Sequence, residues 1–227
     1  MKISEIFESI QGEGIYAGKP AVFLRTALCN LKCSWCDTKY TWDWDNYNYD
    51  KEVKEVLNEE ILNQISRFKI KHLVITGGEP LLQQDEIANL LARKELSGYF
   101  IEVETNCTIV PTEQMLKHVD QWNVSPKTSN SDNKLEEYEI SECYNLFSKL
   151  ENSIFKFVTE SEKDFSEVNY FVKKYNIPEK KVMLMPQASN KEEMILRKNL
   201  VSKLAKSHNL GFSPRIHIEK WDNQRGK

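Results

Sequence analysis

The sequence predicts an α/β protein built as an incomplete parallel β/α barrel of about six strands. Apolar runs rich in β-branched residues recur along the chain, and helix-like stretches lie between most of them. Repeated strand–helix alternation is typical of a parallel sheet with crossover helices. At 227 residues, the chain is short for a closed barrel of about 250 residues, so an open barrel fits best. A doubly wound sheet fits the pattern nearly as well.

The expected strands are the six apolar runs at residues 21–27, 72–77, 99–106, 121–126, 153–159 and 181–187. The clearest expected helices cover 59–68, 84–94 and 191–208, and the last has apolar residues at helical spacing: Met194, Ile195, Leu200 and Leu204. Residues 37–55 lack a clean period and are expected to form a loop or variable insert within a single domain, 1–227. Its aromatic residues are expected to cover a local hydrophobic patch: Trp42, Trp44, Tyr47 and Tyr49.

The composition excludes several classes of function. The net charge is −3, with 31 basic and 34 acidic residues, so nothing indicates binding to nucleic acid or to a membrane surface. No apolar stretch of about 18 residues could span a membrane. Glu5 and Glu8 lie where a signal peptide needs an apolar core, and we expect a cytoplasmic protein. Five cysteines, three of them clustered, indicate reduced thiols rather than a disulfide framework.

Cys29, Cys33 and Cys36 form a C-x3-C-x2-C motif. Thiolates bind soft metals, so the candidates are zinc and an iron–sulfur cluster. Structural zinc needs four ligands, and the nearest histidine, His72, is more than thirty residues away. Three cysteines on a [4Fe–4S] cluster would leave one iron open for a ligand. Zinc is therefore the second choice. Cys107 and Cys143 are expected to pack as small hydrophobic residues.

Polar residues follow several of the expected strands. They are the segments 76–80 (TGGEP), 104–106 (ETN) and 125–127 (SPK), and Gln187. Because ligand sites gather at the carboxyl ends of parallel strands, we expect these residues to line one rim. Glu79 could receive a cationic group. Lys156 lies within a strand and is either a buried partner or a site residue. The glycine-rich segment 8–14 lacks the spacing of a nucleotide loop and is expected to be a turn into the first strand.

The cysteine motif resembles that of the radical S-adenosylmethionine (SAM) superfamily, in which SAM chelates the open iron and one electron splits it to a 5′-deoxyadenosyl radical. Trp35 matches the aromatic residue that lies against adenine there, and TGGEP resembles the motif that meets the SAM amino group. The segments at 11–14 (QGEG), 18–25 (G-x-P-A-V-F-x-R) and 29–38 (CNLKCSWCDT), with TGGEP, ETN and SPK, together resemble the 7-carboxy-7-deazaguanine synthase family. Weaker matches continue to His217.

This resemblance implies conversion of 6-carboxy-5,6,7,8-tetrahydropterin to 7-carboxy-7-deazaguanine with loss of ammonia, in the biosynthesis of queuosine and other 7-deazapurines. It implies a [4Fe–4S] cluster on Cys29, Cys33 and Cys36, SAM, and Mg²⁺ on Thr38. The SAM contacts would be Trp35, Asp37, Gly78, Ser125, Pro126, Lys127 and Gln187. The substrate contacts would be Ile10, Gln11, Gly12, Arg25 and Thr76. No side chain is expected to be catalytic, since the cluster and SAM generate the radical.

The resemblance also implies a homodimer and an electron donor such as a flavodoxin or ferredoxin. The chain departs from the family at two points. Cys107 follows ETN, where glycine is common, and the chain continues past His217 to Lys227, so no terminal substrate contact is carried over. A glycyl-radical activating enzyme would share the cluster and SAM site but has no evident use for the QGEG segment or Arg25. A non-catalytic iron–sulfur or zinc protein would need neither the polar strand ends nor the glycine pair at 77–78.

Overall fold

Nine strands form one open sheet in the computed structural model, which describes residues 1–227. Their spatial order is β3-β1-β2-β4-β5-β6-β7-β8-β9. From β2 to β9 all neighbours are parallel, whereas β1 is antiparallel to both β2 and β3. The strands are β1 (Lys2–Ile10), β2 (Pro20–Thr26), β3 (Lys54–Glu55), β4 (His72–Gly77), β5 (Phe100–Thr105), β6 (Gln121–Val124), β7 (Ser153–Thr159), β8 (Val182–Pro186) and β9 (Gly211–Phe212).

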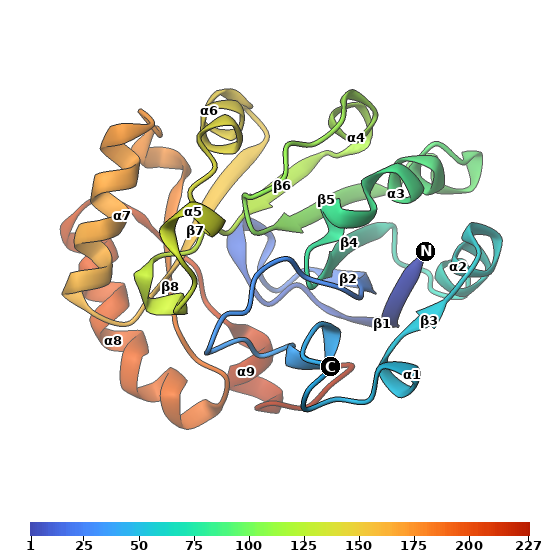
Figure 1. Cartoon of the computed structure of the whole chain (residues 1–227), viewed down its shortest axis with the longest axis horizontal. Helices are drawn as coiled ribbons and strands as arrows, with labels where there is room; N and C mark the ends of the chain where they lie inside the picture. Colours follow the sequence, from blue (N-terminus) through green and yellow to red (C-terminus); the bar gives the residue numbers. More distant parts are fainter.

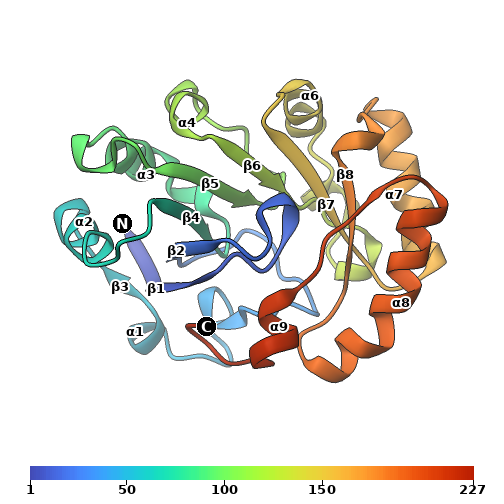
Figure 2. The ribbon, with the colours of Figure 1, turned by 180° about the vertical axis from the view of Figure 1, so that it is seen from behind.

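The helices lie mainly on the outer, convex side of this sheet (Figures 1 and 2). The α-helices are α1 (Tyr49–Glu52), α2 (Asn58–Ile65), α3 (Gln84–Leu91), α4 (Glu113–His118), α5 (Leu135–Tyr138), α6 (Ser141–Lys149), α7 (Glu162–Lys174), α8 (Lys191–Ser207) and α9 (Ile216–Trp221). The short 3-10 helices are η1 (Gly14–Tyr16), η2 (Lys39–Thr41), η3 (Pro80–Gln83), η4 (Lys94–Leu96), η5 (Ser129–Ser131) and η6 (Glu179–Lys181). None of the helices is long and apolar enough to cross a membrane.

The predicted partial barrel is confirmed, and all six expected strands are present as β2 and β4 to β8. The segment 8–14 leads toward β2, the first of the expected strands, but its residues 8–10 are the end of β1, a strand that the sequence did not predict. The turn that follows joins β1 to β2, and two backbone bonds of 2.7 Å between Gln11 and residues Lys19 and Gly18 close it. The sequence does not predict β1 because only Ile3 of its nine residues is buried, so the strand lacks an apolar run.

The three expected helices are α2, α3 and α8. The expected apolar face of α8 is only partly correct. Met194 is buried together with Val201 and Ala205, but Ile195 is 75% exposed. The residues between the cysteine motif and α2 are mostly irregular, as expected for 37–55, with only η2, α1 and the two-residue β3 in them.

The main core lies between the sheet and the outer helices and contains 39 buried residues. Strand residues alternate between this core and the inner face. On β5, Ile101 and Val103 join the core, which directs Glu102 and Glu104 to the inner face. Cys107 and Cys143 are fully buried in the core, as expected for small hydrophobic residues. Charged side chains therefore reach the inner face, where Phe7 and Phe23 also line the cleft, and this is the place where a ligand could bind.

Candidate active site

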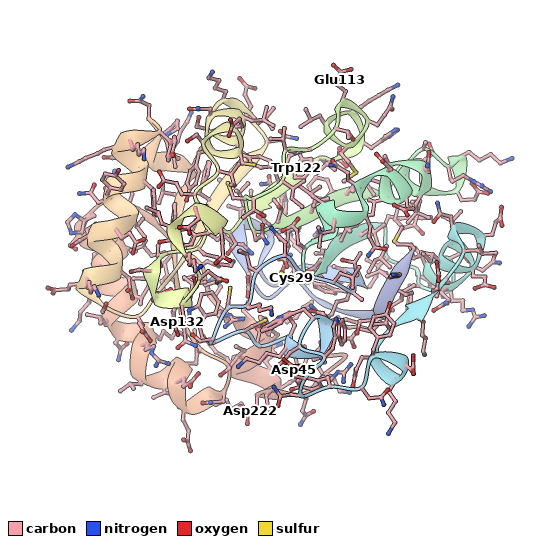
Figure 3. All side chains as sticks on the ribbon, in the orientation of Figure 1. Cys29, Asp45, Glu113, Trp122, Asp132 and Asp222 are labelled. Atoms are coloured by element: carbon pink, nitrogen blue, oxygen red, sulfur yellow. The ribbon has the colours of Figure 1, made fainter.

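The inner face of the sheet opens into a cleft with an empty volume of about 1540 Å³, including its open mouth. The cleft is lined by every site residue expected from the sequence except Pro126 and Gln187. Gln187 lines a neighbouring polar cavity, and Trp35 contributes to both cavities. Figure 3 shows Cys29 near the middle of the molecule, with Asp222 toward the lower edge. The structure thus brings together residues from nearly the whole length of the chain.

The cysteine loop follows β2 and is held by backbone contacts. Leu28 has a positive φ of 76°, which turns the chain at the end of the strand. Its N–H donates to the Thr41 carbonyl at 2.7 Å, and its carbonyl accepts from the Glu79 N–H at 2.8 Å. Gly78 allows this approach, because a Cβ there would overlap the Leu28 carbonyl group. The position of the loop is therefore set by the β4 turn as much as by its own sequence.

Each of the three thiols lies at the cleft and receives an N–H group. Asn133 Nδ2 lies 3.3 Å from Cys33 Sγ, Trp42 Nε1 lies 3.4 Å from Cys36 Sγ, and the Leu31 N–H lies 3.5 Å from Cys29 Sγ. Such donors suit negatively charged sulfur. Burial raises the pKa of Cys29 to about 12 and also raises the pKa of Cys33, so a bound metal is what would make these sulfurs thiolates.

The residues present therefore fit an iron–sulfur cluster with three thiolate ligands. No three His, Cys, Asp or Glu side chains converge closely enough to hold one metal ion. This arrangement does not suit the zinc alternative, whereas a cluster extends over several atoms and needs its ligands further apart. Thr38 lies beside this loop, with its hydroxyl 3.5 Å from Cys36 Sγ, and it also lines the cleft.

A network of charged residues forms the floor of the cleft. Lys156 Nζ lies 2.8 Å from a Glu13 carboxylate oxygen and 3.2 Å from one of Glu104. Arg215 lies 3.0 Å from Glu13 and also pairs with Asp37. Burial alone would raise the pKa of Glu13, but Lys156, Arg215 and His217 outweigh it and hold that pKa well below its usual range. Glu13 is therefore a carboxylate between two cations.

Three of the expected substrate residues also bond to glutamates at or near the cleft. Arg25 is mostly buried and its Nε donates to Glu5 at 2.9 Å, so it is not a surface salt bridge. Gln11 donates to Glu102 at 2.6 Å, and the Thr76 hydroxyl donates to Glu104 at 2.7 Å. These bonds fix the orientation of the three side chains at the cleft, and placed polar groups are what recognition of a flat, polar molecule requires.

Comparison with known proteins places this site in a family. Residues 23–153 match the radical SAM superfamily. The 7-carboxy-7-deazaguanine synthase of Pyrobaculum aerophilum is 38% identical over all of this chain and 97% of its own length. That of Hyperthermus butylicus is 32% identical over 96% of this chain and 92% of its own length. The chain belongs to the 7-carboxy-7-deazaguanine synthase family of radical SAM enzymes.

One solved structure agrees with this assignment, and a second shares the fold. QueE from Escherichia coli superposes with a TM-score of 0.66 and 26% identity, over 93% of this chain and 92% of that one. Streptococcus suis SuiB bound to S-adenosylmethionine gives a TM-score of 0.51 at 17% identity, over 84% of this chain and 48% of that one, and this likeness shows the fold alone. As a radical SAM enzyme, the protein uses a [4Fe–4S] cluster and SAM.

The structure corrects one expectation for a family motif. Glu79 does not face the cleft to receive a cationic group. It is fully buried, and its carboxylate accepts the Leu81 N–H at 3.0 Å, the Thr105 hydroxyl at 2.9 Å and the Asn106 N–H at 2.6 Å. Burial raises its pKa more than these bonds lower it. In this structure Glu79 joins the TGGEP turn to the end of β5.

Several residues that line the cleft could not be predicted from the sequence. The sequence indicates no role for Glu13 in the QGEG segment, and it allows two roles for Lys156, both of which the structure shows: a buried ion-pair partner that also lines the cleft. Arg215 and residues 222–227 gave no signal, yet both line the cleft. The aromatic insert was also misread in part: Trp42 lines the cleft, whereas Trp44 stacks edge-on against Tyr49 at 4.9 Å as a local patch. Cys107 has φ +70°, a backbone conformation that glycine adopts more readily than cysteine.

Proposed function

We propose that this protein converts 6-carboxy-5,6,7,8-tetrahydropterin to 7-carboxy-7-deazaguanine with loss of ammonia, as a step in the biosynthesis of queuosine and other 7-deazapurines. The observation that carries the proposal is one cleft shared by the three-cysteine loop and the charged inner face of the sheet. The names of the full-length relatives support the same reaction. When bound, the cluster and SAM would supply a 5′-deoxyadenosyl radical, and the protein would bind and orient the substrate.

The remaining roles are those of binding and orientation. Arg25 offers a planar pair of donors that suits the substrate carboxylate or a pterin edge. Gln11 and Thr76, together with the backbone at Ile10 and Gly12, bind the pterin on the inner face of the sheet. We assign SAM to the rim residues, which lie beside the cysteine loop or follow the later strands: Trp35, Asp37, Gly78, Ser125, Pro126, Lys127 and Gln187.

Lys127 supports the assignment of the rim. Its Nζ lies 5.7 Å from the centre of the Trp35 ring and donates to the Ser125 carbonyl at 2.7 Å. The aromatic ring of Trp35 and the positive charge of Lys127 therefore lie close together. This pair suits a ligand that has both a base and a carboxylate. Asp37 pairs with Arg215, so any contact it makes with SAM also depends on that arginine.

Magnesium is assigned to Thr38. Mg²⁺ prefers oxygen ligands and usually takes few of them from the protein, with water and substrate oxygens completing its coordination. Thr38 lines the same cleft as the three cysteines and Arg25, and its hydroxyl lies 3.5 Å from Cys36 Sγ. We also propose a homodimer, an electron donor of the flavodoxin or ferredoxin class, and a cytoplasmic location that keeps the five free cysteines reduced.

The test is an anaerobic assay with reconstituted protein, a chemical reductant, SAM, Mg²⁺ and 6-carboxytetrahydropterin. Mass spectrometry should find 7-carboxy-7-deazaguanine with little net loss of SAM. The Cys33→Ala variant should lose the cluster and all SAM cleavage, and Cys143→Ala serves as its control because Cys143 lies in the core. SAM cleavage without product would leave a radical SAM enzyme acting on another substrate, as a glycyl-radical activating enzyme does.

A further inference from the structure

Two side chains outside the cysteine motif make the shortest hydrogen bonds to its sulfur atoms. Trp42 reaches Cys36 from the aromatic insert, and Asn133 reaches Cys33 from the segment after η5. We propose that Trp42 and Asn133 set the reduction potential of the cluster by stabilising its reduced form. The proposal rests on the cluster assigned above and adds a role for two residues that do not coordinate it.

Asn133 is held so that its amide nitrogen faces the sulfur. Its Nδ2 lies 3.3 Å from Cys33 Sγ and 3.1 Å from the Ser131 hydroxyl oxygen. Its Oδ1 accepts the Lys32 N–H at 2.9 Å. Because the oxygen already has a donor on the backbone of the cysteine loop, turning the amide over would break both interactions. The side chain is thus fixed as a donor to the sulfur.

Trp42 is limited to the same role by its chemistry. An indole N–H can only donate, and Trp42 Nε1 lies 3.4 Å from Cys36 Sγ. The η2 turn positions the ring, since the Trp42 backbone N–H donates to the Lys39 carbonyl at 3.0 Å. The contact also gives the insert a function beyond covering a hydrophobic patch.

Cys29 has weaker support. Its donors are the Leu31 backbone N–H at 3.5 Å and Asn106 Nδ2 at 3.9 Å. Both contacts are longer than those that Asn133 and Trp42 make to Cys33 and Cys36, and Asn106 Nδ2 lies much closer to Asn30 Oδ1, at 3.0 Å. We therefore assign the effect on the reduction potential to the hydrogen bonds at Cys33 and Cys36, the two ligands with a closely placed side-chain N–H donor.

The direction of the effect follows from charge. One electron enters the cluster from the donor protein, no bond breaks in that step, and the added negative charge is spread partly over the ligating sulfurs. An N–H donor interacts more strongly with the more negative form, and hydrogen bonds to sulfur are among the factors that set cluster potentials. Removing either donor should therefore make the cluster harder to reduce.

Trp42→Phe keeps the aromatic ring and removes only the N–H. At a fixed potential we expect the ratio of reduced to oxidised cluster to fall about tenfold, which is 59 mV for a one-electron couple. Asn133→Leu should give a shift of the same sign. Trp44→Phe is the matched control, since Trp44 lies in the same insert and stacks on Tyr49 without reaching a cysteine. Its potential should equal that of the wild type.

The measurement is a redox titration followed by electron paramagnetic resonance, without SAM, on proteins with equal iron and sulfide content. Unchanged potentials in both Trp42→Phe and Asn133→Leu, with full clusters, would overturn the inference and leave the proposed function intact. Wild-type protein that cannot hold a cluster would instead overturn the proposed function. If one variant does not fold, the other still decides, because the two donors come from separate segments.

Discussion

Lys156→Met tests the charged floor of the cleft. Lys156 is 1% exposed, and its ammonium group lies between Glu13 at 2.8 Å and Glu104 at 3.2 Å. Methionine fills a similar volume without the charge, so the variant leaves two largely buried carboxylates without that partner. Breaking a buried ion pair in this way costs about 3–5 kcal/mol.

The structure favours the lower end of that range. Glu13 keeps Arg215 at 3.0 Å, and Glu104 keeps the Thr76 hydroxyl at 2.7 Å. We therefore expect a loss of about 3 kcal/mol in the free energy of unfolding, or roughly a hundredfold in the unfolding equilibrium. Urea unfolding of the cluster-free protein at pH 7 measures it. Lys198→Met is the control: Lys198 pairs with Glu219 at 2.7 Å on the surface and should cost less than about 1 kcal/mol.

The pH dependence gives an independent check. The pKa of Glu13 is held below its ordinary value of 4.5 in the folded protein. A lowered carboxyl pKa contributes stability above the ordinary value, and that stability is lost as the pH falls through the folded pKa. The difference between wild type and Lys156→Met should be full at pH 6 to 7 and should shrink below about pH 4.5. A Lys156→Met variant within 1 kcal/mol of the wild type at pH 7 would refute the reasoning.

Three further predictions concern the rest of the cleft. Thr38→Ala should keep SAM binding but raise the Mg²⁺ concentration for half-maximal turnover about tenfold; an unchanged Mg²⁺ response would remove Thr38 as a ligand. Leu28→Gly should raise the free energy of unfolding by about 0.5–1 kcal/mol, because Leu28 has φ +76°, whereas Leu28→Ala, which keeps the Cβ, should give no gain. Arg225→Ala removes a guanidinium 3.6 Å from the Tyr40 ring centre and 2.7 Å from Glu52. It should speed hydrogen exchange in residues 222–227 severalfold, and unchanged exchange would show that other contacts hold this segment.

The sequence was informative wherever local chemistry decides the structure. The runs that became β4 and β7 are apolar and β-branched, and the parallel sheet follows from their alternation with helices. The cysteine loop and the TGGEP turn could be placed because their residue types have few other uses. β1 could not be predicted because its polar residues break the apolar pattern expected of a strand. It is a strand because it pairs antiparallel with β2, and such pairing cannot be recognised from a short stretch of sequence.

The remaining part of the site could not be read from local pattern. Glu79 looked like a ligand residue because it follows a strand, but whether a carboxylate faces the cleft or the protein depends on donors 26 and 27 residues away in Thr105 and Asn106. Arg215 pairs with Glu13 and Asp37 across 202 and 178 residues. Nothing near Arg215 in the chain indicates either partner. Contacts of this length are fixed by the path of the backbone.

The same contacts have a consequence for how the protein is made. Proteins are synthesised from the amino end, and early segments can fold before later ones exist. The cysteine loop and Glu13 leave the ribosome long before Arg215, whose guanidinium joins Glu13 to Asp37. A growing chain can therefore present its three thiols while the charged floor of the cleft is still unfinished. The cleft is complete only when β9 and α9 have been added, so cluster insertion can precede completion of the cleft.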